Sequence, residues 1–344
     1  MPVSVTIYDV AERAGVSTAT VSKTLSNTPY VSEKTRRKVL QAVAELGYRP
    51  SAVARSMAQG RTHTLGCIAP NLTDYTFASM IEGAHAEARR RNYFVLTGSA
   101  EEAADVKPLL EEMLARQVDG LLVINPHVDA RSEFVRPLVE QGLKVVFLSP
   151  SRRTSSVLSV SCDNTTGGYQ ATRYLLGLGH HRIATIVGPG NEAWTLERLA
   201  GYRKALLQQG IAFDPDLVSR GDWTPESGYR CVHELLDGGR DFTALFAQND
   251  KMALGAIRAL RERGLDVPGD VSVVGFDDIP LARYFDPPLT TLHQPLQSFG
   301  EHAARLLIRA IGEPDRAQES LSLAAELVIR ESCAPPSRPS LSRR

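Results

Sequence analysis

Hydrophobic and polar positions divide the chain into two regions with different periods. Near the N-terminus apolar residues recur at helical spacing and mark one face of a short helix: Val10, Ala11 and Ala14. Gly15 follows, where a sharp turn needs a residue that tolerates a positive φ. Ser17 then offers an N-cap for a second helix over about 18–25. The pattern predicts two short helices around a tight turn.

The second predicted helix is too polar on one face to be simply buried. Val21 and Leu25 lie four residues apart and are expected to point inward. The side chains left facing outward are Thr18, Ala19, Ser22 and Lys23. Small polar and basic side chains suit phosphate oxygens and base edges. The sequence therefore predicts a helix-turn-helix that lays its second helix in the major groove of DNA.

A third helix and the charge distribution complete this N-terminal region. The helix is expected over about 32–46, with an apolar stripe of Val39, Leu40, Val43 and Leu46. Residues 1–61 contain 9 Lys and Arg but 4 Asp and Glu, which gives a net charge of +5. The whole chain has 39 residues of each sign, so the remainder carries −5. A basic head on an acidic body is typical of a modular DNA-binding protein.

From Thr64 onward, short apolar runs alternate with amphipathic stretches. In the first set, strands are expected at 65–69, 94–97, 120–124 and 145–148, and helices near 77–91, 104–117 and 131–141. In the second set, strands are expected at 183–187, 244–247 and 271–276, and helices near 165–178, 195–210, 225–237 and 250–263. This succession predicts two parallel sheets, each covered by helices on both faces.

Polar residues follow several of these strands. They are Asn71 and Asp74, Asn125, Ser149, Asn249 and Asp250, and Asp277 and Asp278. Open α/β sheets bind ligands beyond the carboxyl ends of their strands. Two such sheets facing each other would form a cleft for a small polar ligand.

Several features argue against other classes of protein. No apolar run reaches the roughly 18 residues of a membrane span and no signal peptide opens the chain, so we expect a cytoplasmic protein without membrane contact. The four cysteines lie far apart and are expected to be reduced and structural. His180-His181 lacks a third ligand at metal-binding spacing, and the Gly188-Pro-Gly190 string is interpreted as a turn. No catalytic constellation accompanies Asp277-Asp278, so neither an enzyme, a metal nor a cofactor is predicted.

Residues 6–60 resemble the DNA-binding head of the LacI/GalR family. The strings that carry the resemblance are TIYDVAERAGVSTATVSKTLSN, VSEKTRRKVLQAVAELGYRPS and AVARSMAQG. The resemblance implies that Thr18, Ala19 and Lys23 read bases. It places the backbone contacts at Thr6, Ser17, Thr20, Ser22, Thr35 and Tyr48.

Residues 51–58 (SAVARSMA) resemble the hinge helix of the same family. An isolated helix of eight residues is marginal in water, and in the family two copies pair over the DNA. Such a pair enters the minor groove and inserts an apolar side chain between base steps. Met57 stands at this wedge position, where leucine is usual, and Arg55 is a further expected DNA contact.

The rest of the chain, roughly 64–332, resembles the family's effector domain, which is similar to periplasmic sugar-binding proteins. The clearest strings are DNTTGGYQATRYLLGLGHHRIATIVG, ALFAQNDKMALGAIRAL and VPGDVSVVGFDD. The resemblance places Arg198, Asn249 and Asp277 on ligand hydroxyls, and Trp223 against the ligand ring. The other expected effector-binding residues are Asn71, Tyr75, Phe77, Asn125 and Ser149, although serine replaces a carboxylate at the last position.

The resemblance also implies a domain organisation. A helix-turn-helix domain (1–50) and a hinge helix with linker (51–61) precede an effector-binding and dimerisation domain (62–333). Because the family's chain crosses three times between two doubly wound subdomains, the N-subdomain is expected at 62–162 plus 293–320, and the C-subdomain at 163–292 plus 321–333. Residues 334–344 are expected to form a disordered tail without the leucine heptads of a tetramerising coiled coil.

Together these features predict a homodimeric transcription regulator, most simply a repressor of a near-palindromic operator. Its operator affinity would be controlled by a small molecule, with a sugar preferred. A purine-type corepressor and a protein partner remain as alternatives. An exported sugar-binding protein and an enzyme are less consistent with the DNA-binding head.

Overall fold

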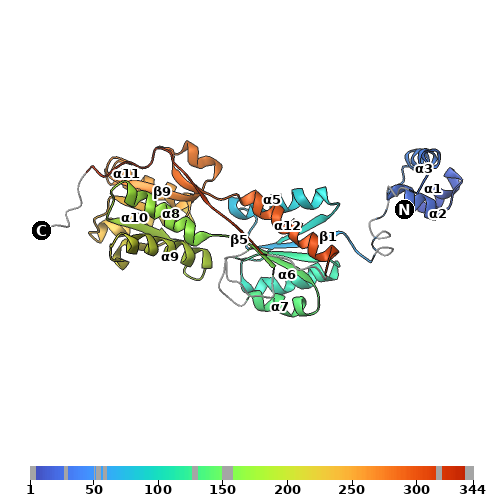
Figure 1. Ribbon diagram of the computed structural model, residues 1–344, viewed down its shortest axis with the longest axis horizontal. Coiled ribbons are helices and arrows are strands. Elements are labelled where there is room, and N and C mark those ends of the chain that lie inside the picture. Colours follow the sequence, from blue (N-terminus) through green and yellow to red (C-terminus); the bar gives the residue numbers. More distant parts are fainter. Residues whose placement is uncertain are drawn as a thin grey trace. The chain divides into compact units, whose positions relative to one another are not determined.

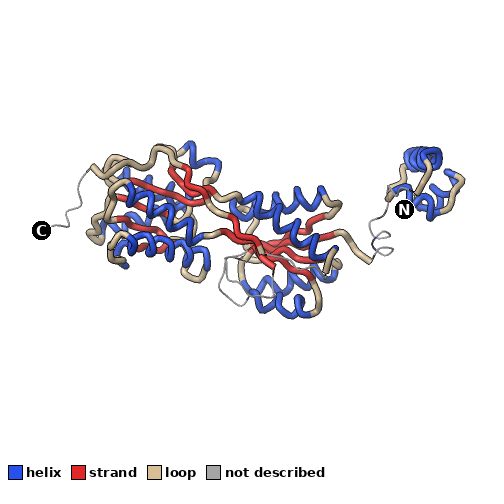
Figure 2. Tube along the Cα trace, in the orientation of Figure 1, coloured by secondary structure: helices blue, strands red, loops and turns tan. Residues whose placement is uncertain are grey.

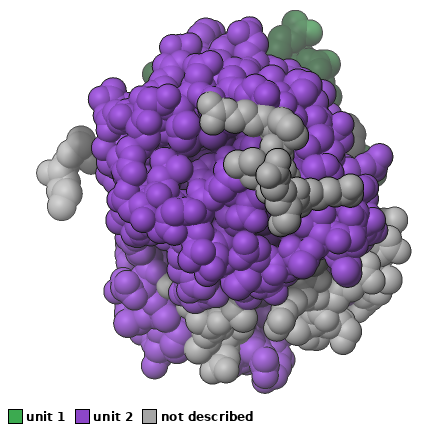
Figure 3. All heavy atoms as spheres, turned by 90° about the vertical axis from the view of Figure 1, so that its left-hand side faces the viewer, with its two compact units in different colours: residues 1–63 green, residues 64–344 purple. Residues whose placement is uncertain are grey.

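The computed structural model describes residues 5–26, 30–49, 51, 56, 60–125, 131–148, 158–314 and 320–337, with only the backbone of 131–133. The chain separates into two compact units, residues 1–63 and 64–344, coloured separately in Figure 3. Within the described ranges, we find no helix that is both long and apolar enough to cross a membrane.

The first unit contains three short helices with well-defined ends. These are α1 (Ile7–Ala14), α2 (Thr18–Leu25) and α3 (Glu33–Leu46). The side chains of Thr6, Ser17 and Ser32 each accept a hydrogen bond from the first turn of the helix that follows. Gly15 and Gly47 end α1 and α3 in the left-handed conformation that glycine adopts without strain.

The three helices share one small core. Val10, Val21 and Val39 are fully buried at its centre. The expected stripe on α3 was partly wrong, because Leu40 is 48% exposed and Ala42 is buried in its place. The proposed hinge helix lies almost entirely outside the described residues, as do Arg55 and Met57.

The second unit is built on two six-stranded sheets. The first has the order β11-β5-β4-β3-β1-β2 and is parallel throughout. Its strands are β1 (Thr64–Ala69), β2 (Phe94–Ser99), β3 (Gly120–Ile124), β4 (Lys144–Leu148), β5 (Leu158–Cys162) and β11 (Leu321–Leu323). In Figure 1, α5 (Tyr75–Arg90) and α12 (Leu296–Gly312) cover one face, while α6 (Ala103–Ala115) and α7 (Arg131–Glu140) cover the other.

The second sheet repeats this design in the order β12-β10-β9-β8-β6-β7. Its strands are β6 (Ile183–Val187), β7 (Val218–Arg220), β8 (Ala244–Ala247), β9 (Ser272–Asp277), β10 (Thr290–His293) and β12 (Glu326–Val328). Only β12 runs antiparallel to its neighbour among these strands. Its helices are α8 (Asn164–Gly177), α9 (Ala193–Gln208), α10 (Pro225–Asp237) and α11 (Asp250–Glu262), and Figure 2 shows the strands sandwiched between them.

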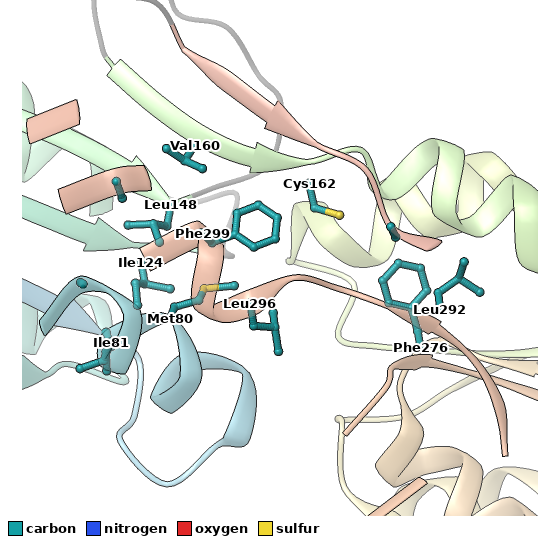
Figure 4. Close-up of a cluster of buried hydrophobic side chains, with 14 of the residues drawn as sticks. Met80, Ile81, Ile124, Leu148, Val160, Cys162, Phe276, Leu292, Leu296 and Phe299 are labelled. Atoms are coloured by element: carbon teal, nitrogen blue, oxygen red, sulfur yellow. The ribbon is translucent and has the colours of Figure 1, made fainter. Parts of the chain in front are cut away.

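The chain passes between the two sheets three times: after β5, after β10 and between β11 and β12. The sequence had placed 321–333 with the second sheet, but β11 pairs with β5 of the first. The third crossing therefore falls at about 324–325 rather than at 320. Figure 4 shows buried side chains at the crossings, where Cys162 lies between a group around Phe299 and a group with Phe276 and Leu292.

Helix α12 joins the first sheet only after the chain has passed through the second. It packs closely against α5 at two glycines: a Cβ on Gly83 would lie 1.9 Å from the Gln297 carbonyl oxygen, and one on Gly300 would lie 1.7 Å from that of Met80. Any larger residue at either glycine would push the two helices apart.

Candidate functional site

The exposed face of α2 carries the residues expected to read DNA. Ala19, Ser22 and Lys23 are exposed there, and Thr18 is half-buried. The Ser17 hydroxyl accepts from the Thr20 amide at 3.2 Å and caps the helix. The remaining expected contacts lie nearby in the same unit: Thr6 caps α1, Thr35 donates its amide to Ser32, and Tyr48 is half-buried beside Gly47.

The second unit encloses a cavity of about 330 Å³, within the size range of small-molecule sites. In the first sheet β1 lies between β2 and β3, and in the second sheet β6 lies between β7 and β8, so the strand order reverses at β1 and at β6. This is the switch point where doubly wound sheets bind ligands. Residues at or just beyond the carboxyl ends of β1, β6, β8 and β9 contribute to the cavity from both sheets. The lining is Pro70, Asn71, Asp74, Thr76, Phe77, Glu101, Pro189, Glu192, Trp194, Arg198, Asp222, Trp223, Thr224, Asn249, Lys251 and Asp277.

Arg198 on α9 lies at the base of this cavity with 3% of its surface exposed. Its Nε donates to Asn164 Oδ1 at 2.9 Å, and its Nη1 donates to the Gln248 carbonyl at 2.5 Å. The guanidinium lies 3.7 Å from the ring centroid of Phe276. Nη2 is 3.8 Å from Asp277 Oδ1, which is longer than a hydrogen bond. Arg198 is thus largely fixed by the protein and turns one edge toward Asp277.

Asp277 ends β9 with an unusual backbone and an unusual proton affinity. Its φ of 113° lies outside the range that side-chain-bearing residues normally adopt. Burial raises the pKa of its carboxyl to about 7, although the neighbouring Arg198 opposes this shift. Burial and the proximity of Asp277 also raise the pKa of Asp250, which accepts from Thr291 Oγ1 and the Ile279 amide. Both carboxyl oxygens of Asp250 therefore accept hydrogen bonds from the protein. Of the two aspartates, it is Asp277 that lines the cavity.

Two further expected residues are tied to each other. Asn249 caps α11 through Oδ1, which accepts from the Met252 amide at 2.8 Å, and its Nδ2 donates to the Trp223 carbonyl at 3.1 Å. Asn249, and not its neighbour Asp250, is therefore the N-cap of α11. Trp223 lines the cavity and donates its indole Nε1 to Glu192 Oε2 at 2.9 Å.

Two contacts join opposite sides of the cavity. Lys251 Nζ, on α11, lies 2.5 Å from Asp74 Oδ2, at the N-terminus of α5. The rings of Phe77 on α5 and Trp194 on α9 have centroids 6.0 Å apart. Each pair links an element packed on the first sheet with one packed on the second.

The structure does not bring all the expected effector residues together. The described residues that line the cavity include Asn71, Phe77, Arg198, Trp223, Asn249 and Asp277 but neither Tyr75 nor Asn125. Tyr75 is 42% exposed as the first residue of α5, and Asn125 is buried after β3. Ser149 lies outside the described residues. Lys251, Trp194 and Glu192 were missed, because they lie within or just before helices rather than directly after a strand. Glu101 was also missed, although it lies two residues after β2.

Other candidate motifs have structural roles. His180 is buried and its ring nitrogens contact Thr243, Ser272 and the Ala334 carbonyl. Within the described part of the chain, no group of three possible ligands is arranged to hold a metal. The four cysteines are unpaired, and burial raises the pKa of the Cys67 and Cys162 thiols to about 12. These thiols are therefore poor nucleophiles.

Comparison with known proteins agrees with both units. Residues 6–51 match bacterial regulatory proteins of the lacI family, and residues 172–333 match the periplasmic binding protein-like domain. The chain is 37% identical over 330 residues to the HTH-type transcriptional repressor PurR of Histophilus somni strain 129Pt. The alignment covers 95% of this chain and 98% of that repressor.

Two solved structures show the same relationship along the whole chain. The Lac repressor dimer bound to operator and the anti-inducer ONPF aligns with a TM-score of 0.87 at 31% identity, over 96% of this chain and 99% of the other. The transcriptional regulator CelR in complex with cellobiose aligns with a TM-score of 0.74 at 35% identity, over 95% and 99%. With a DNA-binding head, a doubly wound body and relatives of this kind, the chain belongs to the lacI family of bacterial regulatory proteins and is a DNA-binding transcriptional repressor rather than an enzyme.

Proposed function

We propose that this repressor acts as a homodimer on a near-palindromic operator and that a neutral sugar in the cavity of the second unit controls its affinity for DNA. The observation that carries the proposal is the composition of the cavity wall. Three aromatic side chains, Phe77, Trp194 and Trp223, are combined there with several carboxyl groups. Aromatic faces suit the apolar face of a sugar ring, and carboxyl oxygens accept hydrogen bonds from its hydroxyl edge.

The charges of the lining favour a neutral ligand over a phosphorylated one. Five carboxyl side chains line the cavity: Asp74, Glu101, Glu192, Asp222 and Asp277. The cationic side chains in the described lining are Arg198 and Lys251, and both lie against carboxylates, Asp277 and Asp74 respectively. A phosphate group would therefore meet an excess of like charge, which costs binding free energy.

Relatives with bound sugars support the same choice. The CelR structure contains cellobiose, and a LacI-family regulator from Enterococcus faecium, 28% identical with a TM-score of 0.71, contains ribose. A purine base could also stack on the aromatic walls, so a purine corepressor is the second candidate. The excess of acceptors over free donors in the lining favours a ligand rich in hydroxyl groups.

The DNA-binding part of the proposal rests on α2. Thr18, Ala19 and Lys23 would read base edges, with Ser22 and the N-terminus of α2 at the phosphates. The other proposed backbone contacts are Thr6, Ser17, Thr20, Thr35 and Tyr48. Arg55 and Met57 would act in the minor groove once two hinge segments pair on the operator.

The test is a thermal-shift and tryptophan-emission screen with cellobiose, ribose, ribose 5-phosphate and free purine bases. A ligand at about 100 times its dissociation constant stabilises the folded state by roughly 2.7 kcal/mol. We expect a neutral sugar to raise the melting temperature and change operator affinity, while ribose 5-phosphate has no effect. Binding of a purine base alone would favour the corepressor, and binding of the phosphorylated sugar alone would contradict the charge argument.

If no small molecule shifts the melting temperature, the sugar proposal loses its support. A protein partner would then be the remaining candidate. Operator binding by the head is measured separately, by fluorescence anisotropy with a labelled duplex, and does not depend on this result.

A further inference from the structure

Glu192 occupies a helix-capping position but does not cap its helix. It is the N-cap residue of α9, and its side chain makes no hydrogen bond to the amides of the first turn. The side chain is instead directed to the indole of Trp223, whose Nε1 donates to Oε2 at 2.9 Å. Glu192 is only 7% exposed. This buried carboxyl group accepts a hydrogen bond from a tryptophan 31 residues away and none from the amides of its own helix. Its position therefore indicates a role other than helix capping.

The backbone of Trp223 is also constrained. Its φ of 71° lies in the left-handed region, which is costly for a residue with a bulky side chain. The Nδ2 of Asn249 donates to its carbonyl at 3.1 Å and helps to hold this conformation. Trp223 is thus fixed at its backbone by Asn249 and at the far side of its ring by Glu192.

The indole packs closely against Gly188, in the turn that follows β6. A Cβ on Gly188 would lie 2.1 Å from Cζ2 and 2.3 Å from Cη2 of Trp223, so the backbone of the turn touches the ring. This close approach needs a glycine, and it is a non-directional contact. The hydrogen bond from Nε1 to Glu192 is directional and therefore fixes the orientation of the ring.

We propose that Glu192 is a positioning residue that orients the Trp223 indole as the ring-stacking wall of the effector cavity. The inference rests on the proposed function of the cavity. Because the indole orientation is already fixed in the free protein, the ligand does not pay for ordering it, and affinity for a ring-shaped ligand rises. Glu192 thus favours a flat or ring-shaped ligand through Trp223, in addition to any hydrogen bond that its own carboxyl accepts from the ligand.

The experiment follows Trp223 directly, since the chain has two tryptophans and both line the cavity. In a W194F background the remaining emission and the single indole NH resonance belong to Trp223. E192Q keeps an oxygen acceptor, whereas E192L removes it. E102L is the matched control, because Glu102 is likewise an N-cap glutamate without a capping hydrogen bond but is exposed and outside the cavity lining.

In the ligand-free protein we expect E192L to move the Trp223 indole NH resonance upfield and to increase quenching of its emission by acrylamide at least twofold. E192Q should stay close to the parent, and E102L should match it. An unchanged resonance and unchanged quenching in E192L would overturn the proposal. If E192L does not fold, hydrogen exchange in the parent and in E192Q provides the test. A Trp223 indole NH that exchanges rapidly with solvent in both proteins would also overturn the proposal.

Cellobiose titration separates this inference from the proposed function. If cellobiose binds the W194F parent, E192L should bind it about tenfold more weakly and E192Q nearly as well as the parent. Equal affinity in all three variants would show that the orientation of the indole does not matter for binding. If cellobiose and the other sugars fail to bind even the wild type, the sugar proposal fails, while the resonance and quenching results still decide whether Glu192 orients Trp223.

Discussion

Replacing Lys251 by methionine should shift the second unit toward a more open cleft in the absence of any ligand. The ion pair between Lys251 and Asp74 joins α11 to the N-terminus of α5, and so can exist only when the two sides of the cavity are close. The lysine side chain is 37% exposed and the aspartate 17%, so solvent screening limits the pair to about 1 kcal/mol. Losing 1 kcal/mol from the closed state alone changes the closed-to-open ratio about fivefold.

Tryptophan emission measures this shift, because Trp194 contacts Phe77 across the same cleft. K251M should give a red-shifted, more quenchable Trp194 signal, measured in a W223F background. Emission of the W223F parent should move the same way when salt rises from 0.05 to 0.5 M, and K251M should respond less. D74N keeps a capping side chain for α5 and should reproduce K251M. K107M is the control, since Lys107 forms an exposed pair within α6.

Emission and salt response equal to the W223F parent in both K251M and D74N would refute this reasoning. It would mean that the Phe77–Trp194 contact and the chain crossings alone decide how closed the ligand-free protein is. A shift in K107M of the same size would mean that the change reflects surface charge in general.

Three further outcomes follow from the structure. Lys23→Ala should weaken operator binding about tenfold and reduce its salt dependence, as measured by anisotropy, without lowering the melting temperature. Arg198→Ala should lower the free energy of unfolding by roughly 3–5 kcal/mol in urea titrations, because it leaves the buried Gln248 carbonyl without its donor and the buried Asp277 without its neighbouring cation; unchanged stability would contradict a structural role. Burial raises the folded-state pKa of Asp277 to about 7 from its ordinary 3.8, so its ionisation destabilises the fold progressively as pH rises from about 4 to 7. Asp277→Asn should flatten that decline when the free energy of unfolding is measured against pH. Parallel curves for the wild type and the variant would show that Asp277 is not the cause of the decline.

Periodicity predicted most of the fold because most strands are buried on both faces. Ala244–Ala247 is apolar throughout and Ile183–Val187 is apolar apart from Thr185; every residue of both strands is buried, and their bounds matched the prediction. The strands at the crossings and the edge strand β7 were missed. β5 (LSVSC) and β10 (TTLH) mix polar and apolar residues, and β7, β11 and β12 have three residues each. Their pairing is decided by distant partners, such as β5 with β11, and not by local pattern.

The cavity was predictable where its residues follow strands and unpredictable where they depend on packing. Asn71, Asn249 and Asp277 were expected from their places at the carboxyl ends of β1, β8 and β9, and they line the cavity. The same rule placed Asn125 there, but it is buried after β3 and does not line the cavity. No sequence signal couples Asp74 to Lys251, 177 positions apart, because their contact depends on how the two sheets face each other.

The late arrival of α12 has a consequence for synthesis of the chain on the ribosome. The first sheet is complete up to β5 once Cys162 has been made, but the face that α12 covers waits until Gly312, about 150 residues later. At roughly 5–20 residues per second, this interval lasts on the order of 8–30 s. During that time the nascent chain exposes the apolar surface that Leu296, Phe299 and Leu307 will bury. This intermediate is where we would look first for chaperone binding and for aggregation at high expression.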